Sequence, residues 1–265
     1  MKILVFGPRD RYDVYRPPFA DEMPVELVFR RPDQTYVQAA QENADARIIF
    51  VDAITDVGPD VMDQLPELKM IHSEGVGYNC IDCQAARERG IYVCNNKGCN
   101  AGAVAEQAIM LMLMLLRHGR TGDLAVREGR QMEVKERYME SGIRELSACR
   151  VGLVGFGDIA KATAERLAPF GCEMVYYSKH RRDRQEEEQY GMTYLSLEEL
   201  TASSDIVSLH CAVNDETRGM VNEAFLTRMR RDAYLVNTAR GDLVDNEALR
   251  QALLTGHLAG VGLDT

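Results

Sequence analysis

A glycine-rich turn near the middle of the chain has the spacing of a phosphate-binding site. The string GxGxxA runs through Gly155, Phe156, Gly157, Asp158, Ile159 and Ala160. An apolar run over residues 151–154 precedes it and helical spacing follows it, so the predicted order is strand, turn, helix. Free backbone N–H groups at the start of such a helix can bind the pyrophosphate of a dinucleotide. The two glycines permit a tight turn and close approach of phosphate, and the small Ala160 lets helix and strand pack.

The residues after the next predicted strand, 173–177, bear on which dinucleotide binds. In NAD-binding units an acidic residue about 20 positions beyond the turn accepts hydrogen bonds from the ribose hydroxyls. Ser178 occupies that place here, and a basic run follows it: Lys179, His180, Arg181 and Arg182. Cations without a carboxylate attract a 2′-phosphate, so we expect Ser178, Lys179 and Arg181 to contact the cofactor and NADP to be favoured over NAD. A solvated basic turn before the acidic run 186–188 is the alternative.

Four cysteines raise the question of a metal site. Their spacing is C-x2-C-x10-C-x4-C, through Cys80, Cys83, Cys94 and Cys99. Four thiolates can hold zinc or an iron–sulfur cluster. However, the first two straddle the start of a predicted helix, the third ends a predicted strand, and cysteine is also an ordinary small buried residue. We therefore expect no metal.

Composition narrows the class of protein. The net charge of −10 argues against a nucleic-acid or anionic-membrane partner, since both need a basic face. The longest apolar run, residues 108–116, is about half of the roughly 18 residues that a membrane-spanning helix needs. Seven cysteines, an odd number, without a recognisable secretory signal indicate reduced thiols. We therefore expect a cytoplasmic protein.

Strands and helices alternate in the first part of the chain. Strands are expected at 2–6, 25–29, 47–51, 68–72 and 91–94, and helices at 34–43, 59–65 and 81–88. This alternation predicts a parallel sheet covered on both faces. Residues 1–98 are therefore expected to form one α/β domain.

A long apolar helix and a second alternation follow. The helix expected at 102–117 is apolar on nearly every side, so it should be buried in a core or at a subunit interface. The charged segment 121–145 is expected to be helical or extended on the outside. Further strands are expected at 151–154, 173–177, 206–210, 233–237 and 260–262, with helices at 160–167, 197–202, 222–229 and 245–254.

The predicted fold is α/β, with two doubly wound parallel-sheet domains and a cleft between them. The first is a flavodoxin-like substrate domain over residues 1–98. The second is a Rossmann dinucleotide-binding domain over residues 99–265.

Four stretches, in this order, resemble the D-isomer-specific 2-hydroxyacid dehydrogenases. They are GVGYNCIDCQAARERGIYVCNNKGCNAGAVAEQ from Gly75, the GxGxxA turn, HCAVNDETRGMV from His210, and LVNTARGDLVDNEALRQALLTGHLAGVGLD over 235–264. The likeness covers most of residues 65–264. It implies an oxidoreductase that transfers a hydride between NAD(P)H and a small 2-keto acid or D-2-hydroxy acid, and a homodimer.

The resemblance also implies which residues meet the substrate. Arg240 would hold the substrate carboxylate and polarise the keto oxygen, a task that suits the planar, always charged guanidinium. Val76 and Gly77 would bind the same carboxylate through backbone N–H groups. Asn100 would line the cleft near substrate and hinge, although an N-cap role for the following helix is an equal alternative.

Other residues are implied to meet the cofactor. Thr217 lies in a loop that runs beside the cofactor in the family. Thr238 and Ala239 match backbone positions beside the nicotinamide ring, and Asp264 matches an aspartate that contacts the carboxamide. His210, just before the loop, fits a packing or cofactor-facing role.

The family's proton donor is a His held by a Glu, and both lie after the GLD motif. The sequence ends at Thr265, one residue past that motif, and no histidine occupies the donor's place among His72, His118, His180, His210 and His257. Loss of a positioned general acid typically costs about 10² to 10⁴-fold in rate. We therefore expect a chain that is truncated relative to the family at its C-terminus. A dinucleotide-binding regulatory or scaffold protein without turnover is the alternative function.

Overall fold

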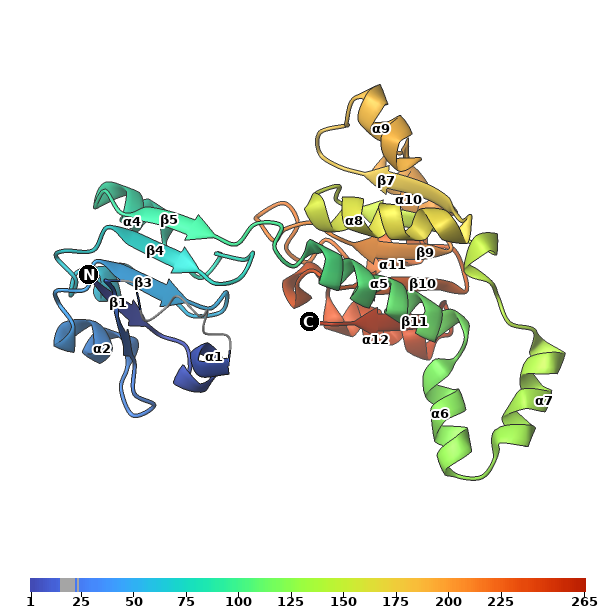
Figure 1. The fold of residues 1–265 in the computed structure, drawn as a ribbon. Helices are drawn as coiled ribbons and strands as arrows, with labels where there is room; N and C mark the ends of the chain where they lie inside the picture. The colour runs from blue at the N-terminus through green and yellow to red at the C-terminus, as the bar shows by residue number, and fades with distance from the viewer. Residues whose placement is uncertain (15–21, 23) are drawn as a thin grey trace. The chain divides into compact units, whose positions relative to one another are not determined.

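The computed structural model describes residues 1–14, 22 and 24–265, which divide into two compact units. Unit 1 is Met1–Cys99 and unit 2 is Asn100–Thr265. Each unit contains one parallel sheet with helices (Figure 1). The predicted fold class of two α/β parallel sheets is confirmed.

Unit 1 has a five-stranded sheet in the order β2-β1-β3-β4-β5, with every neighbouring pair parallel. Its strands are β1 (Lys2–Val5), β2 (Glu26–Phe29), β3 (Ile48–Val51), β4 (Met70–Ser73) and β5 (Tyr92–Asn95). Its helices in the described residues are α1 (Arg9–Val14), α2 (Tyr36–Glu42), α3 (Pro59–Met62) and α4 (Cys83–Glu88). This is the flavodoxin-like strand order, in which ligands bind at the carboxyl ends of the strands.

Local signals in the sequence explain where the helices of unit 1 begin. Thr35 and Gln38 form a reciprocal capping box at the start of α2, and the Asp82 carboxylate accepts the Ala85 N–H at the start of α4. Apolar side chains form a core between the strands and helices, with Leu4 among its buried residues. α1 was not predicted, because its six residues include no buried side chain to set an apolar period.

Unit 2 has a six-stranded parallel sheet in the order β11-β10-β9-β6-β7-β8. Its strands are β6 (Arg150–Val154), β7 (Glu173–Tyr177), β8 (Thr193–Tyr194), β9 (Ile206–Leu209), β10 (Ala233–Asn237) and β11 (Leu258–Leu263). Its helices are α5 (Ala101–Leu116), α6 (Gly119–Arg127), α7 (Gln131–Ser141), α8 (Asp158–Leu167), α9 (Arg184–Tyr190), α10 (Leu197–Ser203), α11 (Glu223–Arg228) and α12 (Asn246–Leu254). Counted from β6, the order is 3-2-1-4-5-6 reversed, the Rossmann arrangement, with its switch point between β6 and β9.

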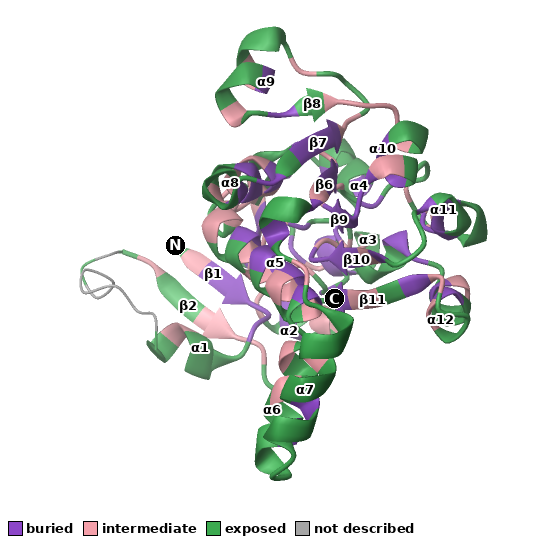
Figure 2. Cartoon of the chain, turned by 90° about the vertical axis from the view of Figure 1, so that its right-hand side faces the viewer, coloured by how far each residue is buried: buried purple, intermediate pink, exposed green. Residues whose placement is uncertain are grey.

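Apolar side chains cover both faces of the unit 2 sheet. Leu153 packs in the cluster that includes residues of α5 and α8, whereas the next residue, Val154, packs in the cluster with residues of α11 and α12. Successive side chains of a strand point to opposite faces, so a continuous apolar strand is buried on both sides. In Figure 2 the strands β6, β9 and β10 are accordingly buried.

The long apolar helix is only partly buried within this chain, so its burial at a subunit interface stays a prediction. α5 buries only one face within the chain, through residues that include Ala105, Ala108 and Met112. Met110 and Met114 remain 47% and 44% exposed. Among the described residues no single helix is long and apolar enough to cross a membrane; α5 and α6 together, bent by 66°, meet that length and composition test.

Helices α6 and α7 form an arm that extends away from the sheet of unit 2 (Figure 1). Most of their residues are exposed (Figure 2), as expected for the outer segment 121–145. The sequence pattern missed α9, where Asp183 caps the helix and Glu187 is buried against Tyr176 and Arg181. A buried glutamate on a short polar helix leaves no apolar period to detect.

Candidate active site

The glycine turn lies between the ends of three strands. Gly155 has φ +97°, and its N–H donates to the Tyr177 carbonyl at 2.8 Å. A Cβ atom on Gly155 would lie 2.8 Å from backbone atoms of His210 and Cys211. Both the backbone conformation and the contact with the end of β9 therefore require glycine at this position.

The start of α8 is open where a phosphate would approach. Gly157 is the N-cap and provides no side-chain cap, and a Cβ atom there would meet no other atom within 4 Å. Asp158 and Ile159 are the first helical residues, where backbone N–H groups have no partner within the helix. Ala160 is fully buried, as the third position of the fingerprint requires. This cradle fits a pyrophosphate group.

Two buried polar atoms at the same edge of the sheet have no partner in the described chain. They are His210 Nδ1, just after β9, and Thr238 Oγ1, just after β10. The other ring nitrogen of His210 lies 2.9 Å from Ser208 Oγ. Burial lowers the pKa of His210 to about 4, so the ring is neutral at pH 7. Unpaired buried polar atoms beside the glycine turn are a further observation that fits a bound polar ligand.

Residues 237–240 form a turn that is held by one buried side chain. Asn237 Oδ1 accepts the Ala239 N–H at 2.9 Å, and Asn237 Nδ2 donates to the Arg240 carbonyl at 2.8 Å. The Arg240 side chain donates to the Ala239 carbonyl and forms no ion pair within the described residues. Its guanidinium therefore keeps donors for an anionic ligand. Sequence reasoning missed Asn237, although the motif contains it.

Two further predicted cofactor residues lie in loops after strands. Asp264 follows β11; its N–H donates to the Asn237 carbonyl at 3.0 Å, and its carboxylate accepts from Gln107 on α5 at 3.1 Å. Thr217 closes the loop after β9 by donating to the Ala212 carbonyl at 2.7 Å. The structure thus gathers the predicted cofactor residues of unit 2 at the carboxyl ends of its strands.

Two cations of the basic run after β7 form ion pairs with glutamates of the chain. Lys179 lies 2.6 Å from Glu216, and Arg181 makes two 2.9 Å bonds to Glu187. These bonds lower the pKa of Glu187. These two cations are therefore paired with carboxylates of the chain, and their contact with the cofactor stays a prediction.

Arg182 differs from its neighbours in the basic run. It donates to the Phe156 carbonyl at 2.9 Å, inside the glycine turn, and its Nε lies 3.9 Å from a Glu186 carboxylate oxygen. It is the cation of the run that contacts the turn itself. Ser178 lies at the end of β7, as the pattern predicts.

The predicted substrate residues Val76 and Gly77 lie in unit 1, in the loop after β4. The Val76 carbonyl accepts from Asn95 Nδ2 at 2.7 Å, and the Gly77 carbonyl accepts from Ser73 Oγ at 2.5 Å. Asn100, the first residue of unit 2, is exposed at the N-cap of α5 but makes no side-chain capping bond.

The cysteines of unit 1 are not arranged as a metal site. Cys83, Cys94 and Cys99 are exposed. No group of three or more His, Cys, Asp or Glu side chains in the described part of the chain could hold a metal ion.

Comparison with known proteins agrees with the fold and the motifs. Residues 109–265 match the family described as "D-isomer specific 2-hydroxyacid dehydrogenase, NAD binding domain". A glyoxylate reductase of Thermofilum pendens is 41% identical over 212 residues, which are 80% of this chain and 62% of that protein. A hydroxypyruvate reductase of Thermotoga maritima is 34% identical over 217 residues, 82% of this chain and 68% of that protein.

A solved structure with bound ligands has a similar fold. The D-lactate dehydrogenase of Aquifex aeolicus, complexed with NAD and lactic acid, has a TM-score of 0.84 at 26% identity, covering 100% of this chain and 77% of that chain. The Rossmann sheet order, the glycine turn that only glycine can form, and these matches lead to one conclusion. The chain belongs to the D-isomer specific 2-hydroxyacid dehydrogenase family.

Proposed function

We propose that the protein reduces a small 2-keto acid to a D-2-hydroxy acid with a hydride from a nicotinamide dinucleotide. One observation carries this proposal. Three features lie at the carboxyl ends of one parallel sheet: the open glycine turn, the His210 and Thr238 atoms without a partner in the described chain, and the Arg240 guanidinium, which has no ion pair there. Relatives named glyoxylate reductase and hydroxypyruvate reductase favour glyoxylate or hydroxypyruvate as substrate.

In this proposal each residue binds a defined part of the substrate or of the cofactor. Arg240 binds the substrate carboxylate and polarises the keto oxygen. The N–H groups of Val76 and Gly77 bind the same carboxylate, and Asn100 lines the substrate site. The dinucleotide, when bound, supplies the hydride, while the turn from Gly155 to Ile159 holds its pyrophosphate.

For the cofactor we propose NADP over NAD. Ser178 presents no carboxylate to repel a 2′-phosphate, and Arg182 places a cation at the glycine turn. The pairing of Lys179 with Glu216 and of Arg181 with Glu187 makes the expected preference modest.

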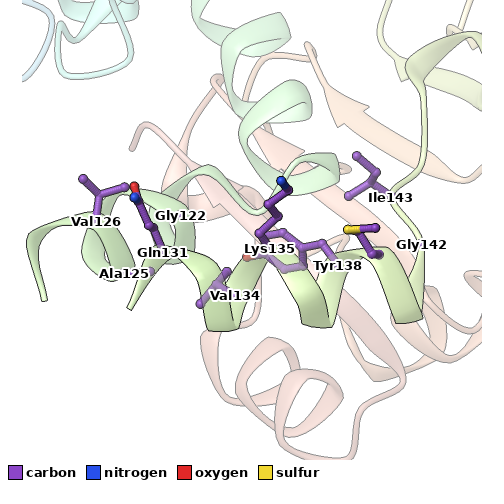
Figure 3. A pocket seen from close by; sticks show the side chains of 10 residues that line it. Gly122, Ala125, Val126, Gln131, Val134, Lys135, Tyr138, Gly142 and Ile143 are labelled. Atoms are coloured by element: carbon purple, nitrogen blue, oxygen red, sulfur yellow. The ribbon is translucent and has the colours of Figure 1, made fainter. Parts of the chain in front are cut away.

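We propose a homodimer formed through the α6–α7 arm. Figure 3 shows an apolar pocket on the arm, lined by side chains that include Val126, Val134 and Tyr138. A second apolar groove on the same unit is lined by α5 and α8 neighbours such as Met110, Met114 and Phe170. Residues 119–143 carry five basic and five acidic side chains within a chain of net charge −10. An arm with balanced charge and an apolar pocket can contact a second copy without the repulsion that other faces would impose.

Sedimentation of the purified chain tests the dimer, with twice the chain mass expected. Met139 is 75% exposed on the arm, so Met139→Asp should give the monomer mass. Leu254→Asp, at a residue 67% exposed on α12, is the matched control and should leave the mass unchanged. A monomer at all concentrations for the unaltered chain would rule the dimer out.

The acidic charge and the cysteine content support a cytoplasmic location.

Separate measurements of binding and turnover test the function. NADPH and NADH binding is followed by fluorescence, and cofactor oxidation is followed with glyoxylate, hydroxypyruvate and related keto acids. The material is the 265-residue chain and, in parallel, any longer natural product that contains it. Tight binding without turnover by every such product would favour the regulatory alternative.

A further inference from the structure

The loop after β4 in unit 1, residues 74–77, has all four of its backbone carbonyls hydrogen-bonded to other groups of unit 1. Besides the bonds from Asn95 to Val76 and from Ser73 to Gly77, the Glu74 carbonyl accepts from Asn96 Nδ2 at 3.0 Å and the Gly75 carbonyl accepts from the Asn96 N–H at 3.0 Å. Four consecutive carbonyls, from residue 74 to residue 77, are thus tied to β4 or to the end of β5.

This arrangement fixes the direction of the N–H groups. In a trans peptide the C=O and the next N–H point to opposite sides, and the described chain has no cis peptide bond. When the carbonyls of residues 74–77 point to the scaffold, the N–H groups of residues 75–78 point away from it. None of these four N–H groups donates to another described residue. Successive unpaired N–H groups are an anion-binding arrangement.

The side chains that hold the loop come from distant places in the sequence. Asn95 ends β5, Asn96 follows it, and they contact residues 19 and 22 positions earlier. Ser73 ends β4 and is fully buried, so its hydroxyl has a fixed direction. Two of the four bonds therefore depend on asparagine amides, which aspartate cannot replace because it lacks the N–H donor.

We propose that Asn95 and Asn96 are positioning residues for the substrate carboxylate. They do not contact the substrate. The Asn95 amide holds the Val76 carbonyl and so orients the Gly77 N–H. Asn96 holds the Gly75 carbonyl through its backbone N–H, which orients the Val76 N–H, and the Glu74 carbonyl through its amide, which orients the Gly75 N–H. This inference rests on the proposed function, because it assumes that the ligand of the loop is a 2-keto acid carboxylate. It adds two residues that determine substrate affinity.

Asn95→Asp and Asn96→Asp test the role, with Asn246→Asp as the matched control. The control makes the same change at an exposed position, the first residue of α12. Each loop variant should raise the KM for glyoxylate about tenfold, the loss expected for one hydrogen bond to a charged group. The cofactor KM should stay within about twofold, which a general loss of folding would not allow. An unchanged glyoxylate KM in both loop variants overturns the proposal.

A second readout does not depend on turnover. Oxalate, a dicarboxylate that cannot be reduced at a keto group, is titrated into ¹⁵N-labelled protein, and the amide signals of Val76 and Gly77 are followed. These signals should shift in the unaltered protein and in Asn246→Asp. In Asn95→Asp, half of the full shift should require about tenfold more oxalate. Absent turnover with a normal oxalate response would reject the proposed function and retain the positioning role. Unresponsive loop amides in the unaltered protein would reject the positioning role.

Discussion

The two units each have a glycine-containing segment with unpaired N–H groups, but they orient those groups differently. In unit 2 the turn at Gly155–Gly157 leads into α8, and the helix itself aligns the N–H groups at its start. In unit 1 the loop at Gly75–Gly77 is followed by no helix until Cys83, and side chains of Ser73, Asn95 and Asn96 orient the peptides. A helix supplies its own alignment, whereas a loop needs residues from elsewhere. The turn in unit 2 can therefore be recognised from a local sequence motif, whereas the loop in unit 1 cannot.

The largest expected effect is at the helix-aligned turn. Gly155→Val would force a left-handed backbone on a β-branched residue and place Cβ about 2.8 Å from the backbone of His210. We expect a loss of at least about 3 kcal/mol in the free energy of unfolding, together with loss of cofactor binding. Urea unfolding and cofactor fluorescence measure these effects. Gly122→Ala, where a Cβ atom meets nothing within 4 Å, should be neutral or stabilising. Equal effects of both changes would show that the turn is not specially constrained.

The next effect concerns the histidine that lies against this turn. In the unfolded chain His210 titrates near 6.5, and in the folded chain its pKa is about 4 because it is buried. The unfolded state then binds more protons between these values, so stability is kept above pH 6.5 and lost as the pH falls toward 4. We expect a loss of about 2 kcal/mol between pH 7 and pH 5 that is absent in His210→Asn. The comparison uses the difference between the two proteins, since other groups also titrate. Parallel pH curves for both would contradict the buried, neutral histidine.

A side chain also orients peptides in unit 2, and its removal sharpens the comparison. Asn237→Ala leaves the Ala239 N–H and the Arg240 carbonyl without their partner. We expect about 2 kcal/mol lower stability and an increase in the keto-acid KM, with unchanged cofactor affinity. Asn222→Ala is the matched control, because it removes the N-cap of α11 at a cost of about 1 kcal/mol without contacting the residue 237–240 turn. A keto-acid KM that rises equally in both variants would argue against a specific role of Asn237.

The smallest expected effect is on cofactor choice. Ser178→Asp places a carboxylate where the ribose hydroxyls of NAD would be bound and a 2′-phosphate would be repelled. We expect the ratio of NADPH to NADH affinity to fall about tenfold, a change of about 1.4 kcal/mol. Binding titrations of both cofactors measure it, and Ser203→Asp on α10 serves as the control. An unchanged ratio would place the 2′ position away from the end of β7.

Much of the architecture could be predicted from local patterns. Continuous apolar runs gave β7 and β10 with their observed ends, and the helices with caps or clear periods were found within a few residues. α1 and α9 escaped detection because neither presents an apolar face. The exposure of Met110 and Met114 was also not predictable, since periodicity shows that a helix is apolar but not which faces the chain covers.

Some features of the candidate site could likewise be predicted from the sequence and others could not. Gly155, Gly157 and Ala160 could be identified from spacing, because backbone conformation and close packing impose their residue types locally. The pairing of Lys179 could not be predicted, because Glu216, 37 positions away, lies beside it only in the folded chain. Pairing across such distances depends on the sheet order, which no short string encodes.

By itself, the amino-acid sequence determined the α/β alternation, the dinucleotide turn and the family. These depend on short-range physics: apolar periods, glycine conformation and residues fixed in one motif. Only the tertiary structure decided that His210 is buried and neutral beside Gly155, and that the end of β5 orients the loop after β4. These contacts join residues from neighbouring parallel strands, and parallel strands are always far apart in sequence because a crossover separates them.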